Sequence, residues 1–164
     1  IKINIQIRNY EKYDKDIWEM QYCKVDFSFI FRDIINYENS SEILLSCEIE
    51  KLKEKLDDLL NDRIAKEFEL EFIEPDFMFH FSLKIKKGIY TINQEDTPKY
   101  FTTKPYLEWK INLWNDGLTS NYFSTTLDID DIKALRCYLS LIMGTITTDD
   151  KEVIKYMNKG IITE

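Results

Sequence analysis

The N-terminal third of the chain alternates apolar and polar residues. Isoleucine occupies every odd position from Ile1 to Ile7, and every even position there is polar. Because successive strand side chains point to opposite faces, this period of two predicts a strand with one buried face. A second alternating run, residues 18–32, predicts one or two further strands. Residues 36–41 are rich in turn formers, and residues 42–46 predict a short strand.

The period then changes to that of an amphipathic helix. Apolar positions at helical spacing follow residue 46, which predicts a helix with one face packed on a sheet. These positions are Ile49, Leu52, Leu56, Leu59 and Leu60. Ser46 or Glu48 is the expected helix start, and Asn61-Asp62 the expected end. Period two returns in residues 68–72 and 77–85, on both sides of Glu74-Pro75-Asp76, and predicts a hairpin.

The same succession of elements returns about eighty residues later. Segments 107–114 and 119–127 flank Asn115-Asp116-Gly117, whose Asp-Gly pair suits a hairpin turn. Asp128 is the predicted N-cap of a second amphipathic helix that ends at Gly144. Residues 149–158 predict a short helix, and its sparse apolar content indicates a peripheral position.

These elements predict a single α+β domain spanning residues 1–164. We expect an antiparallel β-sheet of about six strands with two main helices packed on one face, by the layer logic of such domains. Residues 144–164 form a peripheral C-terminal helical appendage in this prediction. No low-complexity linker divides the chain.

Composition narrows the class of protein. Ten Phe, ten Tyr and three Trp in 164 residues exclude a disordered chain despite a net charge of -8. No stretch approaches the roughly 20 apolar residues of a membrane span, so we expect a soluble protein. Cys23, Cys47 and Cys137 form no CxxC pair, and reduced, mostly buried thiols favour a cytoplasmic location.

The acidic residues are densest between positions 67 and 76, where no Lys or Arg intervenes. This stretch contains Glu67, Glu69, Glu71, Glu74 and Asp76. Such a field repels nucleic acid and anionic membranes and attracts a basic protein partner. Two alternatives stay open: the acidity aids solubility, or Lys84 and Lys86 on an adjacent strand relieve the repulsion.

An aromatic cluster near the second hairpin turn is a second partner-binding hint. Trp114 is offset from the inward phase of Leu107, Trp109 and Ile111, so we expect it on the outer face, beside acids. The alternative that the loop of residues 88–104 or the C-terminal tail covers it stays open. The candidate partner-binding residues are Glu67, Glu69, Glu71, Asp76, Trp114 and Asp116.

Catalytic chemistry is not indicated. The one histidine, His80, cannot build a histidine metal cluster, and the four glycines are too far apart for a phosphate-binding loop. The acids of Asp128-Ile129-Asp130-Asp131 are explained by helix capping and by the helix dipole. We therefore predict no catalytic, cofactor-binding or metal-binding residues, no cofactor and no enzyme activity. A structural or ligand-binding module with an apolar pocket between sheet and helices, and an enzyme using carboxylates alone, remain alternatives.

The order of several short motifs resembles a family. These motifs are Asp16-Ile17-Trp18, Ser46-Cys47-Glu48, Phe72-Ile73-Glu74-Pro75, Leu107-Glu108-Trp109 and Leu127-Asp128-Ile129-Asp130. Over residues 10–143 the chain resembles small bacterial immunity proteins of the WapI type, which accompany contact-dependent toxins. The resemblance implies a non-enzymatic cytoplasmic protein that binds and neutralises a cognate toxin domain, often a nuclease. It locates no toxin-binding residues.

Overall fold

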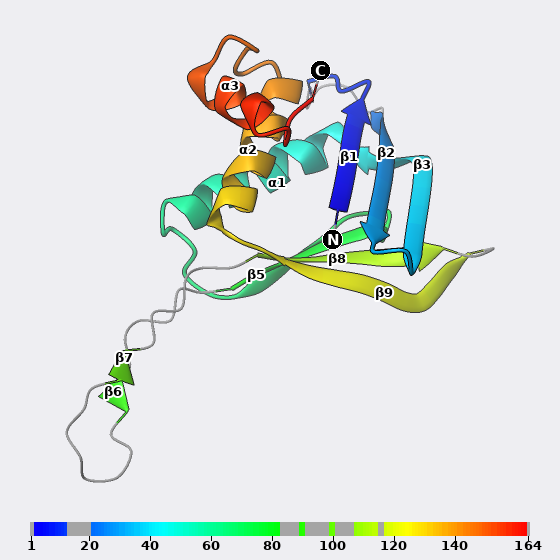
Figure 1. The fold of residues 1–164 in the computed structure, drawn as a ribbon, viewed down its shortest axis with the longest axis horizontal. Helices are drawn as coiled ribbons and strands as arrows, with labels where there is room; N and C mark the ends of the chain where they lie inside the picture. Colours follow the sequence, from blue (N-terminus) through cyan, green and yellow to red (C-terminus); the bar gives the residue numbers. More distant parts are fainter. Residues whose placement is uncertain are drawn as a thin grey trace.

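A computed structural model of the chain describes residues 2–12, 21–82, 107–114 and 117–163, together with the backbone of residues 89–90 and 99–100. Strands and helices follow one another in the order shown in Figure 1. They are β1 (Lys2–Arg8), β2 (Tyr22–Phe31), β3 (Ile35–Leu45), α1 (Ser46–Leu60), β4 (Phe68–Glu71), β5 (Phe77–Phe81), β6 (Ile89–Tyr90), β7 (Lys99–Tyr100), β8 (Leu107–Trp114), β9 (Leu118–Leu127), α2 (Ile129–Ile142) and α3 (Lys151–Asn158).

The strands form separate sheets, so the α+β class is confirmed but the single sheet of about six strands is wrong. β1, β2 and β3 make a three-stranded antiparallel sheet, and a four-stranded antiparallel sheet has the order β4-β5-β8-β9. β6 and β7 pair with each other. The alternation of residues indicates strands but does not say which ladder each strand joins, and helix α1 separates the two larger ladders along the chain.

The two larger sheets pack on each other through aromatic side chains of β2. The ring of Phe27 lies 5.2 Å from that of Phe77 and 5.7 Å from that of Trp109. Phe29 stacks on Phe123 with 4.6 Å between ring centroids. In Figure 1 the strands of the three-stranded sheet run steeply across those of the four-stranded sheet. The buried faces of both sheets therefore belong to one core.

Helices α1 and α2 complete this core from the side of the four-stranded sheet that faces β1–β3 (Figure 1). Ile49, Leu52 and Leu56 of α1 are buried at the predicted helical spacing. The predicted N-cap of α2 is confirmed: the Asp128 carboxylate accepts hydrogen bonds from the backbone N–H groups of Asp130 and Asp131, at 2.8 and 3.0 Å. The second helix thus begins where the sequence predicts.

The turn-rich stretch 36–41 is not a turn, because it lies inside the eleven-residue strand β3. Its backbone pairs with β2, for example Glu38 with Ser28, and this ladder overrides the local turn propensity. The chain reverses earlier, at residues 32–34, where Arg32 has a φ of 51°. Both predicted hairpins, β4–β5 and β8–β9, are confirmed.

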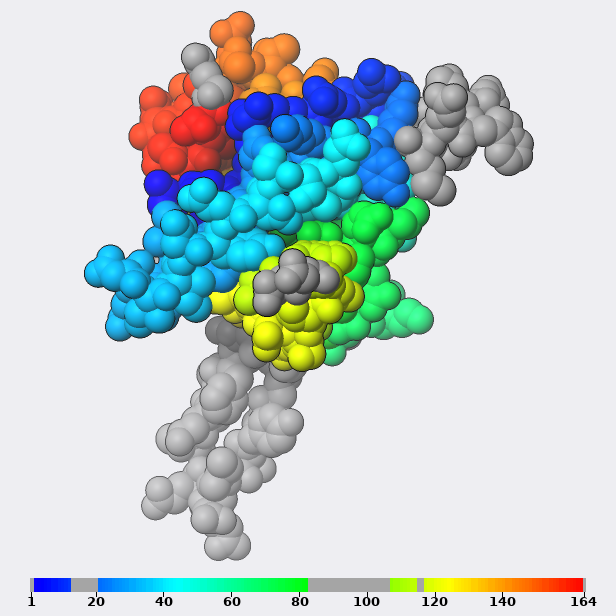
Figure 2. All heavy atoms as spheres, turned by 90° about the vertical axis from the view of Figure 1, so that its right-hand side faces the viewer, coloured from blue at the N-terminus to red at the C-terminus, as the bar shows by residue number. Residues whose placement is uncertain are grey.

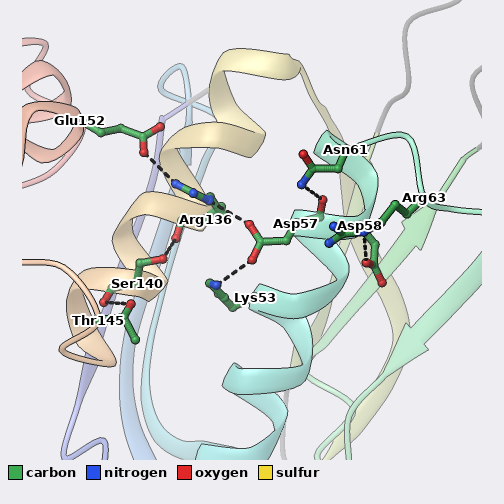
Figure 3. Close-up of polar contacts among 9 residues, drawn as sticks. All are labelled: Lys53, Asp57, Asp58, Asn61, Arg63, Arg136, Ser140, Thr145 and Glu152. Atoms are coloured by element: carbon green, nitrogen blue, oxygen red, sulfur yellow. Dashed lines mark hydrogen bonds and ion pairs between the residues drawn. The ribbon is translucent and has the colours of Figure 1, made fainter.

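The C-terminal helix α3 attaches to α2 through a small apolar cluster of its own. Val153 and Tyr156 of α3 are fully buried and pack with Ala134 and Cys137 of α2 and with Ile162 beyond α3. Polar contacts extend this joint to α1, as Figure 3 shows. Arg136 of α2 donates to Asp57 of α1 at 3.0 Å and to Glu152 at 2.7 Å. One arginine therefore connects α1, α2 and α3.

Asp57 gives this network a predicted pH dependence. Burial raises the pKa of its carboxyl group, but hydrogen bonds from Lys53 and Arg136 outweigh burial, so the net pKa is lowered. A group whose pKa is depressed by folding stabilises the fold above its unfolded pKa of about 3.9, and this stabilisation is lost as the pH falls. We expect Asp57→Asn to cost about 1–2 kcal/mol of unfolding free energy at pH 7.

The cost of Asp57→Asn should shrink as the pH is lowered below about 4, because the unfolded wild-type chain then takes up a proton at this carboxyl group while the folded chain, whose pKa is lower, still does not. Urea unfolding at pH 7 and at about pH 3 measures both values. Asp33→Asn, in the exposed turn between β2 and β3, is the control and should change little at either pH. A cost for Asp57→Asn that stays constant with pH would contradict the expectation.

Candidate partner-binding face

The four-stranded sheet has an outer face that the described helices and the other sheet leave uncovered (Figure 1). Its inner face is buried in the core through residues such as Leu70, Phe79 and Trp109. Because side chains alternate along each strand, the residues between them point outward. The strand register places the outward residues in cross-strand rows. One row is Glu69, His80, Glu108 and Thr126, and the next is Glu71, Met78, Lys110 and Ser124.

The β4 side of this face is acidic. Glu69 and Glu71 are exposed, and the Glu69 carboxylate lies 3.7 Å from Nδ1 of His80. Glu108 lies opposite His80 on the next strand and accepts a hydrogen bond from the Ser124 hydroxyl. Glu69 and Glu108 thus flank His80 on the two neighbouring strands, and Glu71 lies opposite Met78 in the next row. The face carries more negative than positive groups.

The β8–β9 end of the same face is apolar and aromatic. Trp114 pairs with Leu118 in the ladder, and Tyr122 lies on the same side of β9 as Leu118. Their exposed fractions are 37, 52 and 56% respectively. The ammonium group of Lys110 lies 4.2 Å from the centroid of the Tyr122 ring, a cation–π contact. We call this outer surface the acidic–aromatic face. Its members are Glu69, Glu71, Met78, His80, Glu108, Lys110, Trp114, Leu118 and Tyr122.

Asp76 is buried next to Trp114 and does not contribute an exposed carboxylate to the face. It is only 4% exposed. Its pKa is raised, first by burial and also by nearby Glu74, while a hydrogen bond with the Trp114 side chain opposes the rise. Its backbone carbonyl accepts from the N–H of Asn112 at 2.9 Å. The buried Asp76 carboxyl group therefore fixes the position of the Trp114 side chain.

The remaining predicted site residues differ in where they lie. Glu69, Glu71 and Trp114 share the acidic–aromatic face, and Glu67 is exposed immediately before β4. Asp116 lies outside the described residues. Lys84 and Lys86, the expected cross-strand partners of the glutamates, also lie outside the described residues. The residues that pair with Glu69 and Glu71 in the ladder are His80 and Met78.

Sequence reasoning missed that His80 and Glu108 belong to the same surface as the β4 glutamates. The signal that could have found them is the outward phase of both strands. Met78 and His80 occupy the polar phase of the hairpin, and Glu108 and Lys110 occupy the polar phase of β8. Only the pairing of β5 with β8 brings these two phases together.

The described residues offer no other chemistry that would suggest a reaction. They contain no group of three or more His, Cys, Asp or Glu residues placed to hold a metal ion. The three cysteines are free, and burial raises the pKa of Cys23 and raises that of Cys137 to about 11, so both thiols stay protonated at neutral pH. In the same ranges, no helix is long and apolar enough to cross a bilayer.

An enclosed apolar cavity lies where the two helices meet the sheets. Its lining includes Ile7, Leu52, Phe79 and Leu139, and its volume is about 10 Å³. A single water molecule needs about 10–15 Å³ measured in this way. This cavity is a packing defect and has no room for an organic ligand.

Comparison with known proteins identifies the family. The model of the immunity protein WapI-like family matches residues 1–143, which include both larger sheets, α1 and α2. Neither the curated proteins nor the solved structures contain a match. Helix α3 lies beyond the matched residues. The described residues present an acidic and aromatic sheet face, and the chain belongs to the immunity protein WapI-like family.

Proposed function

We propose that this protein neutralises a bacterial toxin domain by binding it, without catalysis, and that the acidic–aromatic face is the contact surface. The partner is a basic protein domain, such as a nuclease whose cationic surface holds phosphate groups. The glutamates steer the encounter and the exposed aromatic side chains anchor the complex. Covering the cationic surface of the toxin then blocks its substrate. The site of action is the bacterial cytoplasm.

The observation that carries the proposal is the combination of Glu69, Glu71 and Glu108 with Trp114 and Tyr122 on one uncovered sheet face. Exposed aromatic residues supply the buried anchors that protein interfaces favour, and acids beside them select a cationic partner. The enclosed cavity between the helices and the sheets, at about 10 Å³, gives no support to the alternative of a ligand-binding module.

Charge reversal on β4 tests the contact surface. The probe is the purified cognate toxin domain, with its activity and its binding measured separately. We expect Glu69→Lys with Glu71→Lys to lower the association rate constant at least about tenfold at low salt, since the steering field changes sign locally. Stopped-flow binding at about 50 and 500 mM salt measures the rate, and the difference should narrow at high salt.

The matched control makes the same change in net charge elsewhere. Asp33→Lys with Glu54→Lys alters two exposed acids, one in the β2–β3 turn and one on α1. This pair should slow association much less than the β4 pair. Equal slowing by both pairs would show that only net charge matters, and a wild-type protein that leaves the toxin active would refute the proposed function itself.

A further inference from the structure

A groove of about 1180 Å³ runs beside β1. Its lining comes from β1, from short stretches of β2 and β3, from Trp109 of β8, from the end of β9, from one side of α2, and from residues 160–163 after α3. Figure 2 shows the C-terminal segment, in red, beside the dark-blue N-terminal strand. Residues 160–163 lie outside the part matched by the family model, so one wall of the groove is not explained by the family.

The groove exposes a free strand edge. β1 lies at the edge of its sheet and pairs only with β2 among the described strands. The N–H of Ile7 donates to the Tyr138 hydroxyl at 2.8 Å, so it points away from β2. Alternate residues of an antiparallel strand point their peptide groups the same way, so those of Ile3 and Ile5 also point away from β2. Within the described residues these groups have no hydrogen-bond partner.

The edge of β1 suits one added strand, because the peptide groups of Ile3 and Ile5 point away from β2 and residues 2–7 all line the groove. A second copy of the chain would bring β2 and the rest of its sheet along with its own β1. A single extended segment is the better fit.

The lining selects the side chains of such a segment. On the inner side, Leu127, Leu135 and Ile142 offer apolar contacts. The charged residues of the lining are Lys2, Asp26, Glu38 and Asp131. Asp26 is paired with Arg8, at 2.5 Å, and Glu38 lies on β3, two strands from the free edge. Asp131 of α2 is exposed and has no ion-pair partner among the described residues. An occupant with alternating apolar and basic residues complements both sides.

We propose that this groove captures an extended cationic segment of the toxin, which adds to β1 as a further strand. The identity of the partner as a toxin rests on the proposed function, while the groove and its free edge do not. β9 borders both surfaces, since Tyr122 lies on the acidic–aromatic face and Leu127 lines the groove. One partner can therefore engage both. Residues 160–163 form part of the groove lining, so their side chains contribute to which segments of the partner can bind.

Hydrogen exchange tests strand addition without the toxin. The probe is the capped heptapeptide Ac-KVKVKVK-NH2, added to the ¹⁵N-labelled full chain. We expect the amides of Ile3 and Ile5 to exchange at least about tenfold more slowly, because they become hydrogen-bonded. Ac-EVEVEVE-NH2 should give no protection. Absence of protection at these two amides, equal protection by both peptides, or protection confined to other strands would overturn the proposal.

A proline substitution separates the backbone contact from the side chain. Ile5→Pro removes a donor that β2 does not use, and proline is tolerated at edge positions of this kind. We expect it to abolish the protection of Ile3 by the cationic peptide, whereas Ile5→Ala, which keeps the N–H, retains most of it. Thermal melting reports whether each variant is folded. Should Ile5→Pro not fold, Ile3→Pro, nearer the strand end, is read by protection of Ile5.

Toxin assays keep the two proposals distinguishable. If wild-type protein neutralises the toxin and folded Ile5→Pro does so with unchanged affinity, the groove proposal is refuted and the proposed function stands. If wild-type protein does not neutralise the toxin, the proposed function fails, and the peptide experiment still decides whether the groove accepts a strand.

Discussion

Replacing Phe29 by alanine is expected to lower the free energy of unfolding by about 3–5 kcal/mol. The Phe29 ring is fully buried and stacks on Phe123 of the opposite sheet at 4.6 Å, with Tyr37 at 5.7 Å on its own sheet. Its removal leaves a cavity at the junction of two sheets, where neither sheet can move inward without breaking its own ladder. Urea unfolding followed by tryptophan fluorescence measures the loss.

The neighbouring residue supplies the control for this substitution. Ile30 points to the other face of β2 and is 36% exposed. Ile30→Ala should cost less than about 1 kcal/mol, because little apolar surface leaves the core. Similar costs for Ile30→Ala and Phe29→Ala would mean that the aromatic junction does not hold the sheets together.

Glu48→Ala is expected to cost about 2–4 kcal/mol, because it leaves two backbone donors without an acceptor. The Glu48 side chain is 9% exposed. One carboxylate oxygen accepts from the N–H of Leu45 at 2.9 Å, at the start of α1, and the other accepts from the N–H of Ile73 at 2.7 Å, after β4. A single side chain therefore caps a helix and secures the loop between β4 and β5.

Two further variants test whether the lost hydrogen bonds cause the destabilisation by Glu48→Ala. Glu48→Gln keeps one acceptor oxygen, so it should lose about half as much unfolding free energy as Glu48→Ala. Glu54→Ala, at an exposed position of the same helix, should have little effect. The capping role would be disproved if Glu48→Ala cost no more than Glu54→Ala in the same urea titration.

Local patterns in the sequence predicted the elements well, because helix caps and side-chain periods are local physics. Asp128 marks the start of α2, and the alternating runs mark both hairpins. The division into two sheets could not be predicted, since β2 and β9 carry equally good strand patterns and only tertiary packing places Phe29 against Phe123. The strand character of residues 36–41 was hidden for the same reason: the ladder with β2 decides it.

The candidate face was predicted in part. The acidic strand phase of Glu69 and Glu71 and the outward position of Trp114 are readable from alternation alone. The burial of Asp76 is not, because the side chain that hydrogen-bonds it comes from a strand more than thirty residues later. The groove beside β1 was equally invisible. Its walls come from both ends of the chain and from β9 and α2, and their meeting depends on how α3 folds back on α2.

The attachment of α3 to α2 has a consequence for how the family boundary is understood. Ala134 and Cys137 lie within the matched part of the chain, yet the residues that shield them from water, Val153 and Tyr156, lie beyond it. The end of sequence similarity at residue 143 is therefore not a place where the molecule can be cut. A fragment that ends at residue 143 would expose an apolar strip along α2, at Ala134 and Cys137, and would become prone to self-association.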